Sequence, residues 1–172
     1  MLNHILVRVR ALRWRAHAWL GRHPRLWHLL HGRGVIRGGP ESIARGVAIG
    51  LFIGLTPTVG FQTMLILLGC LLVAGNFPTA FVASFVTNPF TVAPLYWAYH
   101  ELGRVFFTVL PVLRSDPDVW YLRGVGADIV FTLTGSLLIA TPAAVIGYLL
   151  SRPLSAALLA RRRRRIAKRR GK

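Results

Sequence analysis

Two apolar segments of the chain are each interrupted by polar residues, and these interruptions hold the residue types best suited to binding chemistry. The first interruption is residues 56–60 (TPTVG) and the second is residues 87–94 (TNPFTVAP). Amide side chains offer N–H donors and an acceptor oxygen, and free backbone N–H groups at a helix start attract anions. If the two interruptions meet, they form a polar site able to bind an anion. The residues expected to line this substrate site are Thr58, Gln62, Asn88, Thr91 and Tyr96.

Asn88 also has a purely structural interpretation. Asparagine is a good helix N-cap and proline suits the first helical position, so Asn88 followed by Pro89 is typical of a helix start. The segments LTPTVGFQ and TNPFTVAPLY form a weak internal repeat, because both place a polar residue, a proline and Thr-Val around the interruption. Paired broken helices of this kind are common in transporters. Capping and binding use the same geometry, so both roles stay open for Asn88.

The sequence holds little that could support catalysis. Its five acidic residues form no obvious pair within an apolar segment, and the sequence contains no nucleotide-binding loop or nucleophile motif. Four histidines between residues 17 and 31 stand among arginines, without the cysteine or carboxylate neighbours that would complete a metal site. The single cysteine, Cys70, has no partner in the chain for a disulfide. We therefore expect no enzyme, no catalytic residue, no metal and no cofactor.

The elements that position the polar residues are predicted to be membrane helices. Hydrophobic residues make up 53% of the 172 residues, and the mean hydropathy is +0.50. Residues 46–100 and 129–151 contain no Asp, Glu, Lys or Arg. A helix needs about 20 apolar residues to cross a bilayer, and both runs are long enough. The predicted fold class is therefore all-α, a polytopic helical membrane protein.

The first apolar run is predicted to break rather than to cross as one straight helix. Its arms, residues 46–56 and 61–74, span roughly 16 and 21 Å at helical rise, short of a hydrocarbon core about 30 Å thick. A re-entrant hairpin is the favoured interpretation, and a single kinked crossing is the alternative. The predicted helix breaks are Pro57, Gly60, Pro89 and Pro94. Glycines at every fourth position form a stripe for close helix packing: Gly46, Gly50 and Gly54.

Basic residues are concentrated at the two ends of the chain. The formal net charge is +17, and the Arg and Lys residues cluster in residues 1–45 and 161–172. Positively charged flanking segments stay in the cytoplasm, so both termini are expected to be cytoplasmic. Residues 1–38 are predicted to form a basic amphipathic interfacial helix followed by a Gly-rich linker, with a solvated helix packed on the same protein as the alternative. Residues 39–152 form the predicted membrane domain, and residues 153–172 an Arg-rich cytoplasmic tail.

An even number of crossings follows from this placement of the termini. Residues 46–75 are predicted to form a cytoplasm-facing re-entrant hairpin, and residues 78–110, broken at Asn88-Pro89, to cross outward. The charge-balanced segment 113–127 then lies outside, and residues 128–150 return inward with a kink at Thr141-Pro142.

A chain of motifs between Gly39 and Gly103 resembles a bacterial membrane family, domain of unknown function 2062. The motifs are GPxxIAxGxAIGLFIG (39–54), PTxGxQ (57–62), Asn76 and NPxTxxPxY (88–96). The resemblance implies a small protein of the bacterial cytoplasmic (inner) membrane, and the function of the family is itself unassigned. Related domains joined to glycosyltransferases of the lipid-linked sugar type would imply a link to polyprenyl phosphates.

Three functions are compatible with these features. The favoured one is a small transporter, or a lipid- or anion-handling protein, with its polar site at the two opposed helix breaks. The alternative is a non-catalytic membrane scaffold or accessory subunit of a lipid-linked glycan pathway. A nucleic-acid arm formed by RRRRRIAKRR is the weakest, because anionic headgroups explain such a tail. The expected partners are the lipid bilayer and anionic lipids, with a second copy or another membrane protein as further candidates.

Overall fold

The computed structural model describes residues 35, 38–58, 60–109 and 124–170, and this part of the chain contains helices and no strand. The predicted all-α class is confirmed for these residues. The predicted N-terminal amphipathic helix and most of the predicted external segment lie outside them. The elements are α3 (Pro40–Gly54), α4 (Gln62–Val73), α5 (Phe77–Ala83), the 3₁₀ turn η1 (Ser84–Val86), α6 (Val92–Val109) and α7 (Val125–Arg170).

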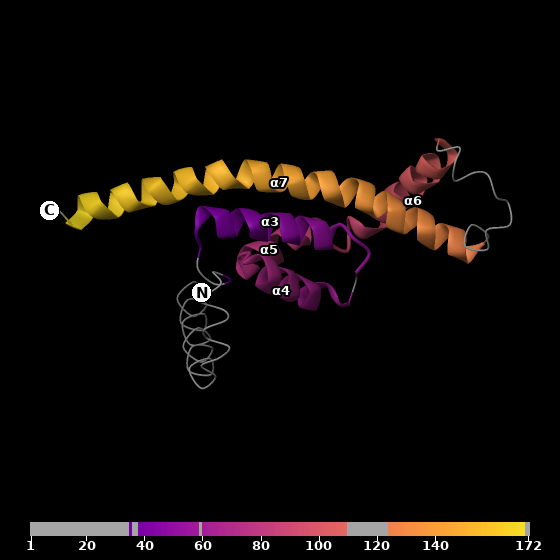
Figure 1. The fold of residues 1–172 in the computed structure, drawn as a ribbon, viewed down its shortest axis with the longest axis horizontal. Coiled ribbons are helices and arrows are strands. Elements are labelled where there is room, and N and C mark those ends of the chain that lie inside the picture. Colours follow the sequence, from indigo (N-terminus) through magenta and orange to yellow (C-terminus); the bar gives the residue numbers. More distant parts are fainter. Residues whose placement is uncertain (1–34, 36–37, 59, 110–123, 171–172) are drawn as a thin grey trace, which may run out of the picture.

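The long helix α7 runs the length of the molecule, α3 and α6 pack along it, and α4 and α5 pack against α3 (Figure 1). Pro142 and Pro153 lie inside this helix, which continues through both, so the predicted tail from residue 153 begins within α7. Both α3 and α6 run antiparallel to α7. The start of α3 meets the C-terminal half, where the Ser155 hydroxyl donates to the Pro40 carbonyl at 3.2 Å. Farther toward the start of α7, Gly135 lies against the backbone of Tyr99 in α6.

A helical hairpin formed by α3 and α4 is followed by α5, which runs parallel to α3. The end of α4 lies beside the first turns of α3, where Arg45 Nη1 donates to the Val73 carbonyl at 3.0 Å. The Asn76 amide then donates to the Ser42 carbonyl at 2.7 Å, which places the start of α5 beside the start of α3. The chain therefore folds as three short antiparallel passes before α6 continues in the direction of α5.

The parallel pair of α3 and α5 is held at backbone contact by glycine. A Cβ added at Gly46, Gly50 or Gly54 would overlap the backbone of Asn76, Ala80 or Ser84, respectively. The offset between the partners is thirty residues in each case, so one register holds along the whole contact. Small residues permit this approach because no side chain separates the two helices.

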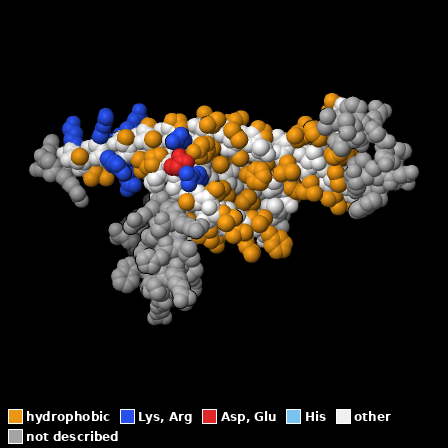
Figure 2. All heavy atoms as spheres, viewed as in Figure 1, with side chains coloured by type: hydrophobic (Ala, Val, Ile, Leu, Met, Phe, Trp, Pro, Cys, Tyr) orange, Lys and Arg blue, Asp and Glu red, His pale blue; other side chains and the backbone are white. Residues whose placement is uncertain are grey.

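The described residues bury few large apolar side chains and expose many. The core cluster consists of Val35, Ile66, Cys70 and Ala80, packed against partly buried neighbours. Hydrophobic side chains cover much of the face in Figure 2, whereas Lys and Arg gather toward the C-terminal end of α7. By length and composition, α7 is the one helix within the described residues that could cross a membrane. These features support association with a membrane.

Candidate functional site

The first helix break is closed by threonine hydroxyls. After α3 ends at Gly54, the hydroxyls of Thr56 and Thr58 donate to the Ile53 carbonyl at 2.9 and 3.2 Å. They satisfy a carbonyl that the end of a helix leaves without an intrahelical donor. Pro57 and Gly60 lie in the loop between α3 and α4, and Gly60 has a φ of 93°, a conformation that favours glycine.

The second break is organised by Asn88, which caps the turn that leads into α6. Its Oδ1 accepts hydrogen bonds from the amides of Phe90 (2.9 Å) and Thr91 (3.2 Å). The Thr91 hydroxyl in turn accepts from the Asn88 amide at 2.9 Å, so the two residues form a reciprocal capping box. Pro89 follows the cap directly, and Pro94 is the third residue of α6, where a proline removes no intrahelical hydrogen bond.

A second asparagine cap starts α5. Asn76 Oδ1 accepts from the amide and the hydroxyl of Thr79, at 3.0 and 2.6 Å. The pattern Asn-x-x-Thr therefore occurs twice, at 76–79 and 88–91, each time with a proline between the two residues. The repeat predicted from the sequence pairs residues 55–62 with 87–96, whereas the closer structural pair is residues 76–79 with 88–91.

The two breaks meet in space. The Thr87 hydroxyl donates to the Gly54 carbonyl at 2.5 Å, and Gln62 Nε2 donates to the Ser84 carbonyl at 3.3 Å. The contacts of α3 with α5 and η1 place Ser84 beside Gly54, which brings the end of η1 to the loop after α3.

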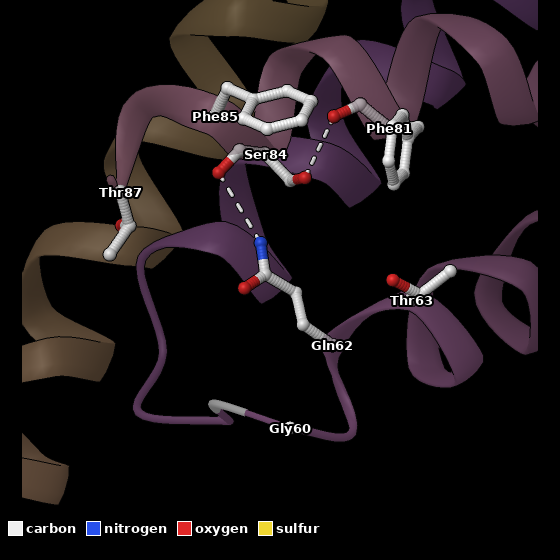
Figure 3. A pocket seen from close by; sticks show the side chains of 7 residues that line it. All are labelled: Gly60, Gln62, Thr63, Phe81, Ser84, Phe85 and Thr87. Atoms are coloured by element: carbon white, nitrogen blue, oxygen red, sulfur yellow. Dashed lines mark hydrogen bonds between the residues drawn. The ribbon is translucent and has the colours of Figure 1, made fainter. Parts of the chain in front are cut away.

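A pocket of about 300 Å³ opens where the breaks meet (Figure 3). Gly60, Gln62 and Thr63 line one side, from the start of α4. The opposite side is lined by Phe81, Ser84, Phe85 and Thr87. Within the described part of the chain, Gln62 Oε1 and the Thr63 hydroxyl have no hydrogen-bond partner, so both remain available to a ligand. The pocket is therefore polar on its α4 side and partly aromatic on the other.

Only Gln62 among the predicted site residues lines this pocket. Thr58 bonds back to α3, while Asn88 and Thr91 are occupied by the cap of α6. The Thr91 hydroxyl also lies 2.9 Å from the Val86 carbonyl. Tyr96 packs against Tyr99, with ring centroids 5.9 Å apart. A role in substrate binding for these residues stays a prediction.

A helix start without a side-chain cap, the feature expected to attract an anion at α6, occurs instead at α4. The first amides of α6 are satisfied by Asn88, whereas the first turn of α4 has no side-chain cap. The uncapped N–H groups of Gln62 and Thr63 belong to residues that line the pocket. Free amides at a helix start carry partial positive charge and favour anions.

A family model described as "Uncharacterized protein conserved in bacteria (DUF2062)" matches residues 24–165. The chain belongs to this bacterial family. The match extends beyond the motifs between Gly39 and Gly103 to include all of the apolar part of α7, so both breaks and the helix against which they pack lie inside the DUF2062 region. No curated protein and no solved structure matches the chain.

A charged cluster lies away from the pocket of this DUF2062 protein, between α6 and α7. His100 Nε2 lies 3.0 Å from Asp128 Oδ1, and Arg104 Nη2 donates to Glu101 Oε2 at 2.6 Å. Among the described residues, no group of three or more His, Cys, Asp or Glu side chains is arranged to hold a metal ion. The His100–Asp128 contact joins α6 to α7, whereas the Arg104–Glu101 pair lies within α6.

Proposed function

We propose that the protein is a multi-pass protein of the bacterial inner membrane, with both termini in the cytoplasm and the break pocket near the middle of the bilayer. The ion pair between Arg152 and Glu41 (3.0 Å) supports a membrane boundary at that level. From Asp128 to Arg152, α7 rises about 36 Å, enough to cross a core about 30 Å thick. From Arg45 to Gly54, α3 descends about 14 Å, which is close to half of that thickness.

In this placement the α3–α4 pair is a re-entrant hairpin, and α5 with α6 forms a broken outward crossing. Irregular backbone at membrane depth is tolerated only where it is buried in protein or lines a cavity. The meeting of the two breaks around one pocket satisfies this condition. The same arrangement occurs in transporters, whose binding sites are formed by broken helices near the midplane.

The function that we propose is the binding of a small anionic group, as a small transporter or a lipid- or anion-handling protein. The observation that carries this proposal is the pocket itself, where the uncapped start of α4 faces the polar groups of Ser84 and Thr87. A scaffold or accessory subunit is the second candidate. It is favoured by the basic end of α7, whose residues 161–168 are exposed and available to a partner.

Cysteine accessibility tests the placement and the pocket together. In a Cys70→Ala background, Thr63→Cys lines the pocket, whereas Met64→Cys stands 70% exposed on α4 and does not line it. We expect a charged, water-soluble thiol reagent to modify Thr63→Cys in membranes and to leave Met64→Cys unmodified in lipid. Modification of both would contradict membrane burial of α4. Modification of neither would contradict an open pocket.

A further inference from the structure

An apolar groove of about 440 Å³ lies between α3, α4 and α7 and shares no lining residue with the break pocket. Its walls include Ala48, Phe52, Ile53, Gly69 and Ala144, while Arg45 and Tyr148 stand at one end. From Arg45 to Ile53 the groove follows α3 for about 12 Å, close to the roughly 15 Å of hydrocarbon in one leaflet.

The polar end of the groove is a cluster centred on Glu41. This carboxylate accepts from the Tyr148 hydroxyl at 2.6 Å, from Arg45 Nε at 3.1 Å and from Arg152 Nε at 3.0 Å. One carboxylate between two guanidinium groups leaves a net charge of +1. The cluster therefore complements a ligand that carries one negative charge.

The two guanidinium groups keep donors available for such a ligand. Arg45 Nη1 donates to the Val73 carbonyl, but Arg45 Nη2 and both terminal nitrogens of Arg152 have no partner within the described residues. The two side chains are 43% and 63% exposed. Because Glu41 holds each guanidinium through Nε, Arg45 Nη2 and both terminal nitrogens of Arg152 remain available, and such N–H donors suit the oxygens of a phosphate group.

We propose that this groove binds an acyl chain of an anionic phospholipid whose phosphodiester is held by Arg45 and Arg152. Glu41 and Tyr148 act as positioning residues that fix the two arginines beside the mouth of the groove. The proposal rests on the membrane placement given above and is independent of any ligand in the break pocket.

Native mass spectrometry of the full chain, released from bilayers of equal phosphatidylglycerol and phosphatidylcholine, tests the headgroup contacts. We expect the wild type to retain phosphatidylglycerol preferentially. Loss of two charge-assisted contacts in the Arg45→Gln/Arg152→Gln variant should lower that retention by roughly tenfold or more. The matched control is Arg161→Gln/Arg162→Gln, which removes the same charge from exposed positions of α7 outside the groove. Equal retention by the wild type and the first variant, or equal loss in both variants, would overturn the proposal.

A second variant tests the groove without altering the charged cluster. Ala48→Phe fills the groove and should reduce phosphatidylglycerol retention, whereas addition of excess glycerol phosphate, the headgroup without chains, should not displace the lipid. Unchanged retention in Ala48→Phe, or displacement by glycerol phosphate, would contradict acyl-chain binding. Carbonate washing separates the two proposals: a chain that leaves the membrane contradicts the placement, and an inserted chain without lipid preference contradicts this site alone.

Discussion

The hydroxyl of Thr87 donates to the carbonyl oxygen of Gly54 at 2.5 Å, which joins the end of α3 to the loop that precedes α6. This bond connects two breaks that lie 33 residues apart in the sequence. It provides a donor to a carbonyl that the end of α3 leaves without an intrahelical partner. The polar residues at the breaks therefore stabilise the fold as well as being candidates for binding a ligand.

Thr87→Val should destabilise the protein by about 1–3 kcal/mol, because the buried Gly54 carbonyl loses its donor while the side-chain volume hardly changes. Thr87→Ser keeps a hydroxyl and should stay close to the wild type. Unfolding of the purified protein in mixed detergent micelles measures both. Equal stability of the valine variant and the wild type would show that the bond contributes nothing.

Gly50→Ala should cost about 1–3 kcal/mol, because the new methyl group overlaps the Ala80 carbonyl and the Cβ of Ala83. Gly39→Ala is the control, since a Cβ there meets no atom within 4 Å. Thermal melting of both variants compares them directly. A melting temperature for Gly50→Ala as high as that of Gly39→Ala would contradict the close packing of α3 on α5.

Asn88→Ala should lose the cap of α6 and about 1 kcal/mol of stability, whereas Asn88→Asp should retain the cap. Thermal melting distinguishes the two substitutions. Ligand binding by a stable Asn88→Asp variant then tests a role beyond capping, because an aspartate would repel an anion. Full binding by that variant would leave Asn88 with the structural role alone.

The pKa of Glu41 lies below its ordinary value of 4.5, first because Tyr148 donates a hydrogen bond to the carboxylate and then because Arg45 and Arg152 are close. A lowered folded-state pKa stabilises the protein above the unfolded-state pKa, and this contribution is lost as the pH falls through the folded-state pKa. The wild type should therefore be more stable than Glu41→Gln near neutral pH, and the difference should shrink below pH 4.5. Denaturation curves across pH 3–7 test this, and a constant difference would contradict it.

Ser115→Cys, in a Cys70→Ala background, should react with an impermeant thiol reagent added to the outside of intact cells. The expected result follows from placing the α6–α7 connection on the external side. Labelling only in inverted membrane vesicles would reverse the proposed topology.

The short-range features of the fold were predictable from the sequence. Asn88 followed by Pro89 predicted a helix start, and Pro57 with Gly60 predicted the end of the first helix arm, because both signals act within one turn of the backbone. Pro94 was predicted to break a helix, but it lies within the first turn of α6. Both a break and a first turn accommodate proline, so sequence alone did not distinguish them.

The composition of the pocket was not predictable, because it depends on contacts between distant segments. Ser84 and Thr87 enter the pocket only because the register between α3 and α5 places residue 84 beside Gly54. The glycine stripe indicated that a partner helix would approach closely, but it did not identify the partner. The signal that could have suggested these residues is the repeated Asn-x-x-Thr pattern, which marks two helix starts on either side of the short α5–η1 segment.

The contacts between the start of α3 and the far half of α7 impose an order on biosynthesis. Tyr148 and Ser155 bond to Glu41 and Pro40 across 107 and 115 positions, so the first described helix reaches its final partner only after nearly all the intervening chain has been translated. Until then, the face of α3 that packs on α7 is uncovered, and Glu41 is paired with Arg45 but still lacks Tyr148 and Arg152. We therefore expect the docking of α3 on α7 to be among the last steps in the folding of the described residues.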